Sequence, residues 1–143
     1  MNGVGWRDVT ATVVTIAEMQ CGVERTRKQH PDVAAAIDRW IDKMLADGEP
    51  QILPMGVSAS RPLGKMYETP SLRHFIVTDP TAKDAATGAD LAIAAIAIAA
   101  GGVVATSNVG HFLEVHNAFP LPGLFNPVDS QWHVSPTGGL MPT

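Results

Sequence analysis

The stretch Ala89–Phe112, ADLAIAAIAIAAGGVVATSNVGHF, decides how the rest of the chain is interpreted. Its first half is rich in alanine and isoleucine, which predicts a helix that is apolar on most sides and therefore buried. Gly101 and Gly102 end this helix. The apolar residues Val103–Ala105 then predict a short strand, and a buried helix followed by a strand is half of an α/β unit.

Two polar residues stand at the ends of this unit. Asp90 begins the helix and Asn108 follows the strand. Because the helix runs antiparallel to its strand, we expect both residues at one edge of the sheet, where ligands of α/β proteins bind. An acid and an amide at one edge suit a hard cation. The structural alternative is an aspartate favoured by the helix dipole and an asparagine in a turn.

The totals indicate an ordinary globular protein. A length of 143 residues predicts one domain, and the net charge of −4 argues against a general basic surface for nucleic acid. The single cysteine, Cys21, permits no internal disulfide and suggests a reducing compartment. The N-terminus lacks a signal-peptide pattern, and the longest apolar run is short for a membrane span. We therefore expect a soluble, cytoplasmic protein without membrane contact.

The N-terminal part of the chain repeats the junction between a strand and a helix. Val9–Thr15 is rich in β-branched residues and predicts a strand. Thr15 and Glu18 have the spacing of a capping box, which places Glu18 in the first turn of a helix that ends near Arg27. Glu18 then occupies the same kind of position as Asp90, although it also fits the role of a cap partner alone.

The remaining pattern alternates helices with short strands. A helix opened by Pro31 and closed at Gly48 has one apolar face, on which we predict Trp40 to be core. The full predicted order is strand, helix, helix, strand, helix, helix, helix, strand, helix, strand, with Pro62 interrupting the third helix. This alternation predicts a mostly parallel sheet. Residues 135–143 are expected to be a disordered tail.

The sequence contains no glycine-rich phosphate loop, no cluster of histidines and cysteines, and no nucleophile elbow. What remains is a set of oxygen donors: Glu18, Asp90 and Asn108. Such donors suit Mg²⁺ or Mn²⁺, and carboxylates that hold these ions can activate water for phosphodiester cleavage.

At these residues the chain resembles the PIN-domain ribonucleases of the VapC toxin type, close to the group known as plasmid stability proteins. The resemblance covers about residues 13 to 133 and is carried by three pieces in order: VTIAEMQCGVER, GADLAIAAIAIAAGGVVATSNVGHF and FPLPGLFNP. It implies an α/β fold, a three-layer domain over residues 1–134 with a central, mostly parallel sheet flanked by helices.

The resemblance also implies an activity and a site. The activity is metal-dependent cleavage of RNA by the toxin of a type II toxin–antitoxin pair, with Mg²⁺ or Mn²⁺ as cofactor. Glu18 and Asp90 match the metal-binding acids, Asn108 matches the acid or amide after the strand, and Thr106 matches a hydroxyl that assists. The implied partners are a small antitoxin, an RNA substrate and a second copy of the chain.

This sequence departs from the family pattern in two places. The family begins with a strand that carries a leading aspartate in a motif like LDTN, and no such segment precedes Glu18 here. Ser107 stands where an arginine is common. With two carboxylates we expect weak metal binding. The alternative functions are a truncated, inactive PIN-like protein that keeps only antitoxin or dimer contacts, and a structural domain whose acids are helix caps.

Overall fold

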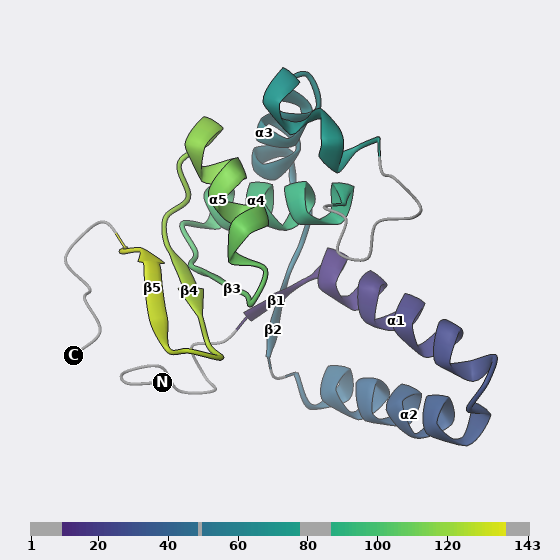
Figure 1. Cartoon of the computed structure of the whole chain (residues 1–143). Coiled ribbons are helices and arrows are strands. Elements are labelled where there is room, and N and C mark those ends of the chain that lie inside the picture. The colour runs from purple at the N-terminus through teal and green to yellow at the C-terminus, as the bar shows by residue number, and fades with distance from the viewer. Residues whose placement is uncertain (1–9, 49, 78–86, 137–143) are drawn as a thin grey trace. The chain divides into compact units, whose positions relative to one another are not determined.

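The computed structural model describes residues 10–48, 50–77 and 87–136. Contacts divide the chain into two compact units, Val4–Pro54 and Met55–Thr143 with the first residues of the chain, and each is described by itself. Figure 1 shows the elements of both units. Among the described residues, no helix is long and apolar enough to span a membrane. The expected tail at 135–143 lies almost entirely outside the described residues.

The N-terminal unit is a pair of strands with a helical hairpin inserted between them. Its elements are β1 (Thr10–Thr12), α1 (Val13–Arg27), α2 (Pro31–Asp47) and β2 (Gln51–Leu53). The two strands pair in parallel, with Thr10 opposite Gln51. Parallel strands need a long crossover connection, and α1 and α2 supply it. The predicted boundaries of α2 are confirmed, since Gly48 has a φ of 73° and ends the helix.

Two predictions about this unit are wrong. The helix begins at Val13, because the hydroxyl of Thr12 accepts a hydrogen bond from the Thr15 backbone N–H at 3.0 Å. Thr12 and not Thr15 is therefore the N-cap, and Glu18 lies beyond the first turn. Trp40 was predicted to be core, but 57% of its surface is exposed. The small core between the helices consists of Val23, Ala34 and Ile41, with Met19 packed against it.

A polar cluster joins α1 to α2 beside that small core. Arg27 donates to Glu24 on its own helix and to Asp38 on α2, each at 3.1 Å. Gln20 also bridges these two acids. The hydrogen bond from Arg27 lowers the pKa of Glu24 below its ordinary value. These groups are exposed or half-buried, so each contact contributes little to stability by itself.

The C-terminal unit contains the larger core. Its elements are α3 (Val57–Tyr67), the 3₁₀ helix η2 (Pro70–Phe75), α4 (Gly88–Ala100), β3 (Val104–Ala105), α5 (Val109–Ala118), β4 (Leu124–Asn126) and β5 (Gln131–Val134). Pro62 lies inside α3 without ending it, so the predicted interruption is wrong. The alanine-rich α4 is buried as predicted and packs against α3, η2 and α5 (Figure 1).

The sheet of this unit has a parallel and an antiparallel pair. β3 pairs with β4 in parallel, and β4 pairs with β5 in antiparallel fashion. The ten predicted elements occur in the predicted order, but β5 was missed. The fold is mixed α/β, as expected. The described strands form one two-stranded parallel sheet and one mixed three-stranded sheet, so the expected three-layer domain with a central, mostly parallel sheet stays a prediction.

Candidate functional site

The site in the C-terminal unit is built where two helices begin. α4 begins after Thr87, and α5 begins after Asn108, which is its N-cap. Asp90 and His111 each occupy the third position of their helix. Helical side chains lean toward the N-terminus of their own helix, so both lie over a helix start. The structure brings these two side chains together.

Asp90 is fixed by a backbone contact. The N–H of Thr87 donates to Asp90 Oδ2 at 3.3 Å, which is the carboxylate half of a capping box. Only 14% of the Asp90 side chain is exposed. The first turn of a helix also favours a negative charge. Asp90 therefore acts as an acid in the first turn of α4, the structural alternative considered from the sequence. Its carboxylate lies partly buried beside His111.

The separation between Asp90 Oδ2 and His111 Nδ1 is 3.4 Å. The Nδ1 atom is buried and has no hydrogen-bond partner in the part of the chain that the structure describes. The ring of His111 meets Phe75 edge-on, with ring centroids 6.1 Å apart. Phe75 itself is fully buried, so His111 packs against the edge of the core.

Thr106 and Asn108 form the turn between β3 and α5. The Thr106 N–H donates to the carbonyl of Phe125 at 3.0 Å, which fixes the end of β3 against β4. The Thr106 hydroxyl then accepts from the Asn108 N–H at 3.0 Å. The side chain of Asn108 is exposed and does not cap α5. The turn therefore places His111 next to Asp90, and the side-chain amide of Asn108 makes no capping hydrogen bond to α5.

Glu18 belongs to the other unit. It lies on α1 and is exposed. The residues proposed as metal ligands, Glu18 and Asp90, are thus described in separate units. Among the described residues, no group of three or more histidine, cysteine, aspartate or glutamate side chains is placed to hold a metal. The Asp90 carboxylate and the orphaned His111 nitrogen fit a divalent cation that keeps most of its water ligands.

The sequence does not single out His111, because its histidines form no cluster with the spacing of metal ligands. His111 and His116 have the wrong spacing for a shared zinc site, and His116 instead accepts the Leu121 N–H through Nδ1 at 2.9 Å. The signal that was available is positional. His111 follows Asn108, the N-cap of α5, by the same interval that separates Asp90 from Thr87, the N-cap of α4.

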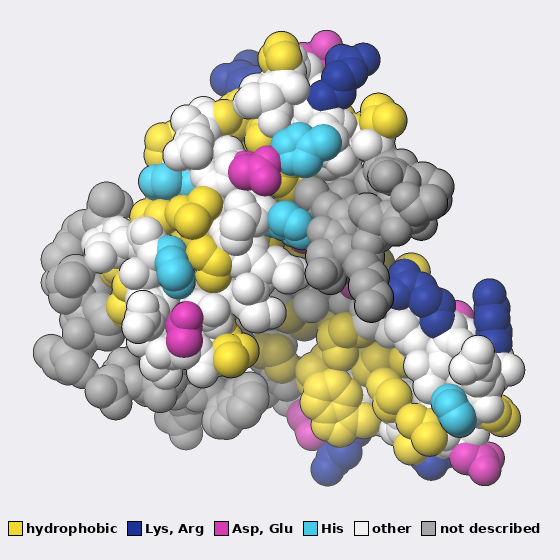
Figure 2. Space-filling view, in the orientation of Figure 1, with side chains coloured by type: hydrophobic (Ala, Val, Ile, Leu, Met, Phe, Trp, Pro, Cys, Tyr) yellow, Lys and Arg dark blue, Asp and Glu magenta, His cyan; other side chains and the backbone are white. Residues whose placement is uncertain are grey.

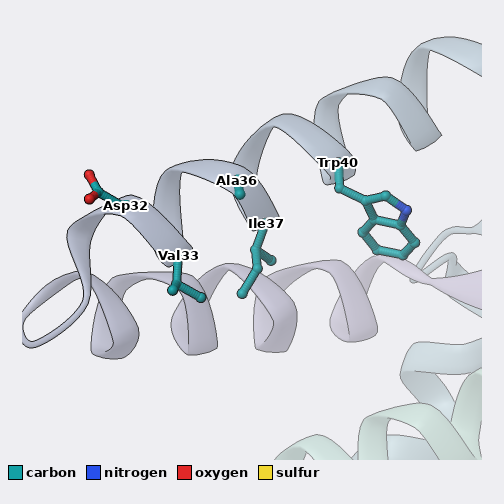
Figure 3. Close-up of a pocket in the computed structure, with 5 residues that line it drawn as sticks. All are labelled: Asp32, Val33, Ala36, Ile37 and Trp40. Carbon is teal, nitrogen blue, oxygen red and sulfur yellow. The ribbon is translucent and has the colours of Figure 1, made fainter.

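An apolar groove on α2 is a second feature that the sequence did not predict. It is lined by Asp32, Val33, Ala36, Ile37 and Trp40. Figure 3 shows Val33, Ile37 and Trp40 on one side of the helix, with Asp32 turned away. In the space-filling view, hydrophobic side chains gather over α2 (Figure 2). We call Val33, Ile37 and Trp40 the α2 stripe.

Comparison with known proteins gives one informative result. No protein-family model and no curated protein matches the chain. Among solved structures, a chain of the structure described as FitAB bound to an IR36 DNA fragment matches with a TM-score of 0.57 and 23% sequence identity. The match covers 91% of this chain and 80% of that one. This likeness shows that the two chains share a mixed α/β fold.

Proposed function

We propose that the chain is a metal-dependent endoribonuclease, the VapC-type toxin of a type II toxin–antitoxin pair. The observation that carries the proposal is the fold shared with FitAB over most of the chain. That likeness supports a relation to toxin–antitoxin proteins. The position of Asp90 supports it further, because the resemblance assigns a metal-binding acid to this helix start.

Each residue of the site has a role in this proposal. Glu18 and Asp90 hold the ion, directly or through water, and Asn108 positions a water or a phosphate oxygen. Thr106 assists by fixing the turn that presents Asn108. Mg²⁺ or Mn²⁺ bound by these acids would supply a Lewis acid for the phosphodiester and offset the repulsion between carboxylates and phosphate.

The proposed partners are an RNA substrate, a small antitoxin and a second copy of the chain. The α2 stripe supports a protein partner, because contiguous exposed apolar surface marks protein–protein contact sites. FitAB itself is bound to a DNA fragment in the matching structure. A short gene that overlaps the one encoding this chain would support the antitoxin assignment.

The direct test is cleavage of a structured RNA with Mg²⁺ or Mn²⁺, using wild type and Asp90→Asn. Asparagine keeps an oxygen that can accept the Thr87 N–H, so the helix cap survives while the charge is lost. We expect cleavage to fall by more than about 100-fold, as for loss of an important metal-site residue, with an unchanged melting temperature. Glu68→Gln, an exposed acid at the end of α3, is the matched control. Full cleavage by Asp90→Asn would refute the proposal.

A second candidate is an inactive PIN-like protein that keeps only its protein contacts. The observation that favours it is the helix-capping hydrogen bond of Asp90, which gives this acid a structural role without any ion. It predicts no cleavage by wild type at any Mg²⁺ or Mn²⁺ concentration, and a lower melting temperature in Asp90→Ala than in Asp90→Asn.

A further inference from the structure

One buried polar atom in the C-terminal unit requires an explanation. His111 Nδ1 has no hydrogen-bond partner among the described residues. Leaving a polar atom buried without a partner costs free energy, so such atoms are rare and often mark an unseen ion or water. Asp90 Oδ2 lies 3.4 Å from this nitrogen.

This separation is longer than an ordinary hydrogen bond, lies within ion-pair range for a charged His111, and also fits two ligands of one cation. N–H···O hydrogen bonds have donor–acceptor distances of about 2.7–3.2 Å. Two ligand atoms that each lie about 2.0–2.1 Å from a tetrahedral Zn²⁺ are roughly 3.3–3.4 Å apart. The observed distance between Oδ2 and Nδ1 therefore matches that of two neighbouring ligands on one ion.

We infer that His111 Nδ1 and Asp90 Oδ2 together bind a first-row transition-metal ion, Mn²⁺, Co²⁺ or Zn²⁺, and that His111 gives the site its preference over Mg²⁺. The inference deepens the proposed function and rests on it for its biological role. It names a nitrogen ligand that the acid set of Glu18, Asp90 and Asn108 does not contain.

The surroundings of both ligands support the assignment. The Thr87 N–H orients the Asp90 carboxylate, which is the kind of outer contact that metal ligands use. The His111 ring meets the ring of the buried Phe75 in a T-shaped contact, and Nδ1 has no hydrogen-bond partner among the described residues. Among the described residues, no third histidine, cysteine or carboxylate is placed to join these two ligands.

The chemistry of the two donors sets the metal preference. Mg²⁺ requires oxygen ligands in near-ideal octahedral geometry. Imidazole nitrogen suits transition metals, whose affinity for such sites rises from Mn²⁺ through Co²⁺ and on to Cu²⁺. A site with one carboxylate and one imidazole is therefore weak for Mg²⁺ and stronger for Co²⁺ or Zn²⁺.

The test measures metal binding without RNA. Co²⁺ is titrated into wild type, His111→Gln and the control His133→Gln, an exposed histidine on β5, and its visible absorption is recorded. Calorimetry with Mg²⁺ runs in parallel. We expect His111→Gln to weaken Co²⁺ binding by at least about tenfold and to leave Mg²⁺ binding unchanged. His133→Gln behaves as wild type.

Three results would overturn the inference: wild type that binds no Co²⁺, His111→Gln that binds Co²⁺ like wild type, or an equal loss for Co²⁺ and Mg²⁺. The last would reduce His111 to a residue that positions Asp90. The imidazole ¹⁵N shift of His111 on adding Zn²⁺ to wild type provides a second readout that needs no variant; an unshifted Nδ1 resonance contradicts the assignment. Because neither measurement uses RNA, a protein that binds Co²⁺ through His111 but cleaves nothing would refute only the proposed function.

Discussion

Helices α2 and α4 both carry apolar residues at helical spacing, and the structure uses them in opposite ways. In α4, six residues are buried: Leu91, Ala92, Ala94, Ala95, Ile96 and Ala97. In α2, only Ala34 and Ile41 are buried, and the α2 stripe is exposed. The difference teaches that an apolar pattern establishes a helix face, whereas the number of elements packed around the helix decides whether that face is core.

The same contrast separates two kinds of surface. At the start of α4 a partly buried aspartate lies beside a partly buried histidine, and such a pair is a candidate metal-binding site. The α2 stripe presents apolar side chains, which suit a protein partner. We expect changes at the first to alter ion binding and cleavage, and changes at the second to alter association.

The largest expected effect is on the free energy of unfolding when one leucine in each helix is replaced by alanine. Leu91 on α4 is fully buried, whereas 44% of Leu45 on α2 is exposed. Leu91→Ala should reduce the free energy of unfolding by about 2–5 kcal/mol, since it leaves a cavity in the core. Leu45→Ala should cost less than about 1 kcal/mol.

Urea denaturation followed by circular dichroism measures both values, and amide hydrogen exchange of α4 and α2 locates the loss. Equal losses for the two leucines would mean that α2 is as deeply packed as α4, and the comparison between the helices would fail.

A smaller loss of stability is expected when the glycine that ends either helix is replaced by alanine, and the loss should be similar for the two helices. Gly48 ends α2 with φ at 73°, and Gly101 ends α4 with φ at 67°. Alanine at either position is strained in this left-handed conformation, at about 1–2 kcal/mol. Gly102→Ala is the control, because Gly102 has no positive φ and no heavy atom near its added Cβ.

Thermal melting of the three variants checks this expectation. If Gly102→Ala lowers the melting temperature as much as Gly101→Ala does, the stability of the helix end depends on packing and not on backbone conformation.

The smallest effect concerns pH and the polar cluster between α1 and α2. The hydrogen bond from Arg27 lowers the pKa of Glu24 in the folded state. The Glu24 carboxyl group therefore binds a proton less tightly in the folded state than in the unfolded state. Its contribution to folding stability is complete above its ordinary pKa of 4.5 and is lost as pH falls through the lowered pKa. Wild type should exceed Glu24→Gln in melting temperature slightly at pH 7, and this difference should disappear as pH falls through the lowered pKa.

Because Glu24 is exposed, added salt should shrink even this difference. A difference in melting temperature that stays the same as pH falls through the acid range would show that the carboxylate acts through packing and not through charge.

The sequence predicted the helices and strands better than it predicted which of their residues are buried or in contact. The alanine-rich helix, its glycine end and the turn after β3 are local features, and each occurs as predicted. The N-cap of α1 was misplaced because Thr12 and Thr15 both fit a cap, and only the hydrogen bond to the Thr15 N–H distinguishes them. Trp40 was misassigned because burial depends on neighbours that periodicity does not reveal.

The candidate site was predicted in part for the same reason. Asp90 was found from its place at a helix start and Asn108 from its place after a strand, and both places are local. His111 was missed, because its importance comes from a contact with Asp90 across 21 positions of the chain. Whether Glu18 and Asp90 serve one ion is also a long-range property, and it stays a prediction.

The measurement that tests this central claim most directly is calorimetric titration of Mn²⁺ into Glu18→Gln, with Glu24→Gln as the control on the same helix. Both residues are exposed glutamates of α1, so the two changes remove the same charge from the same element. Glu18→Gln should weaken Mn²⁺ binding by at least about tenfold, and Glu24→Gln should leave it unchanged. Wild-type affinity in Glu18→Gln, or an equal loss in both variants, would contradict a site shared by Glu18 and Asp90.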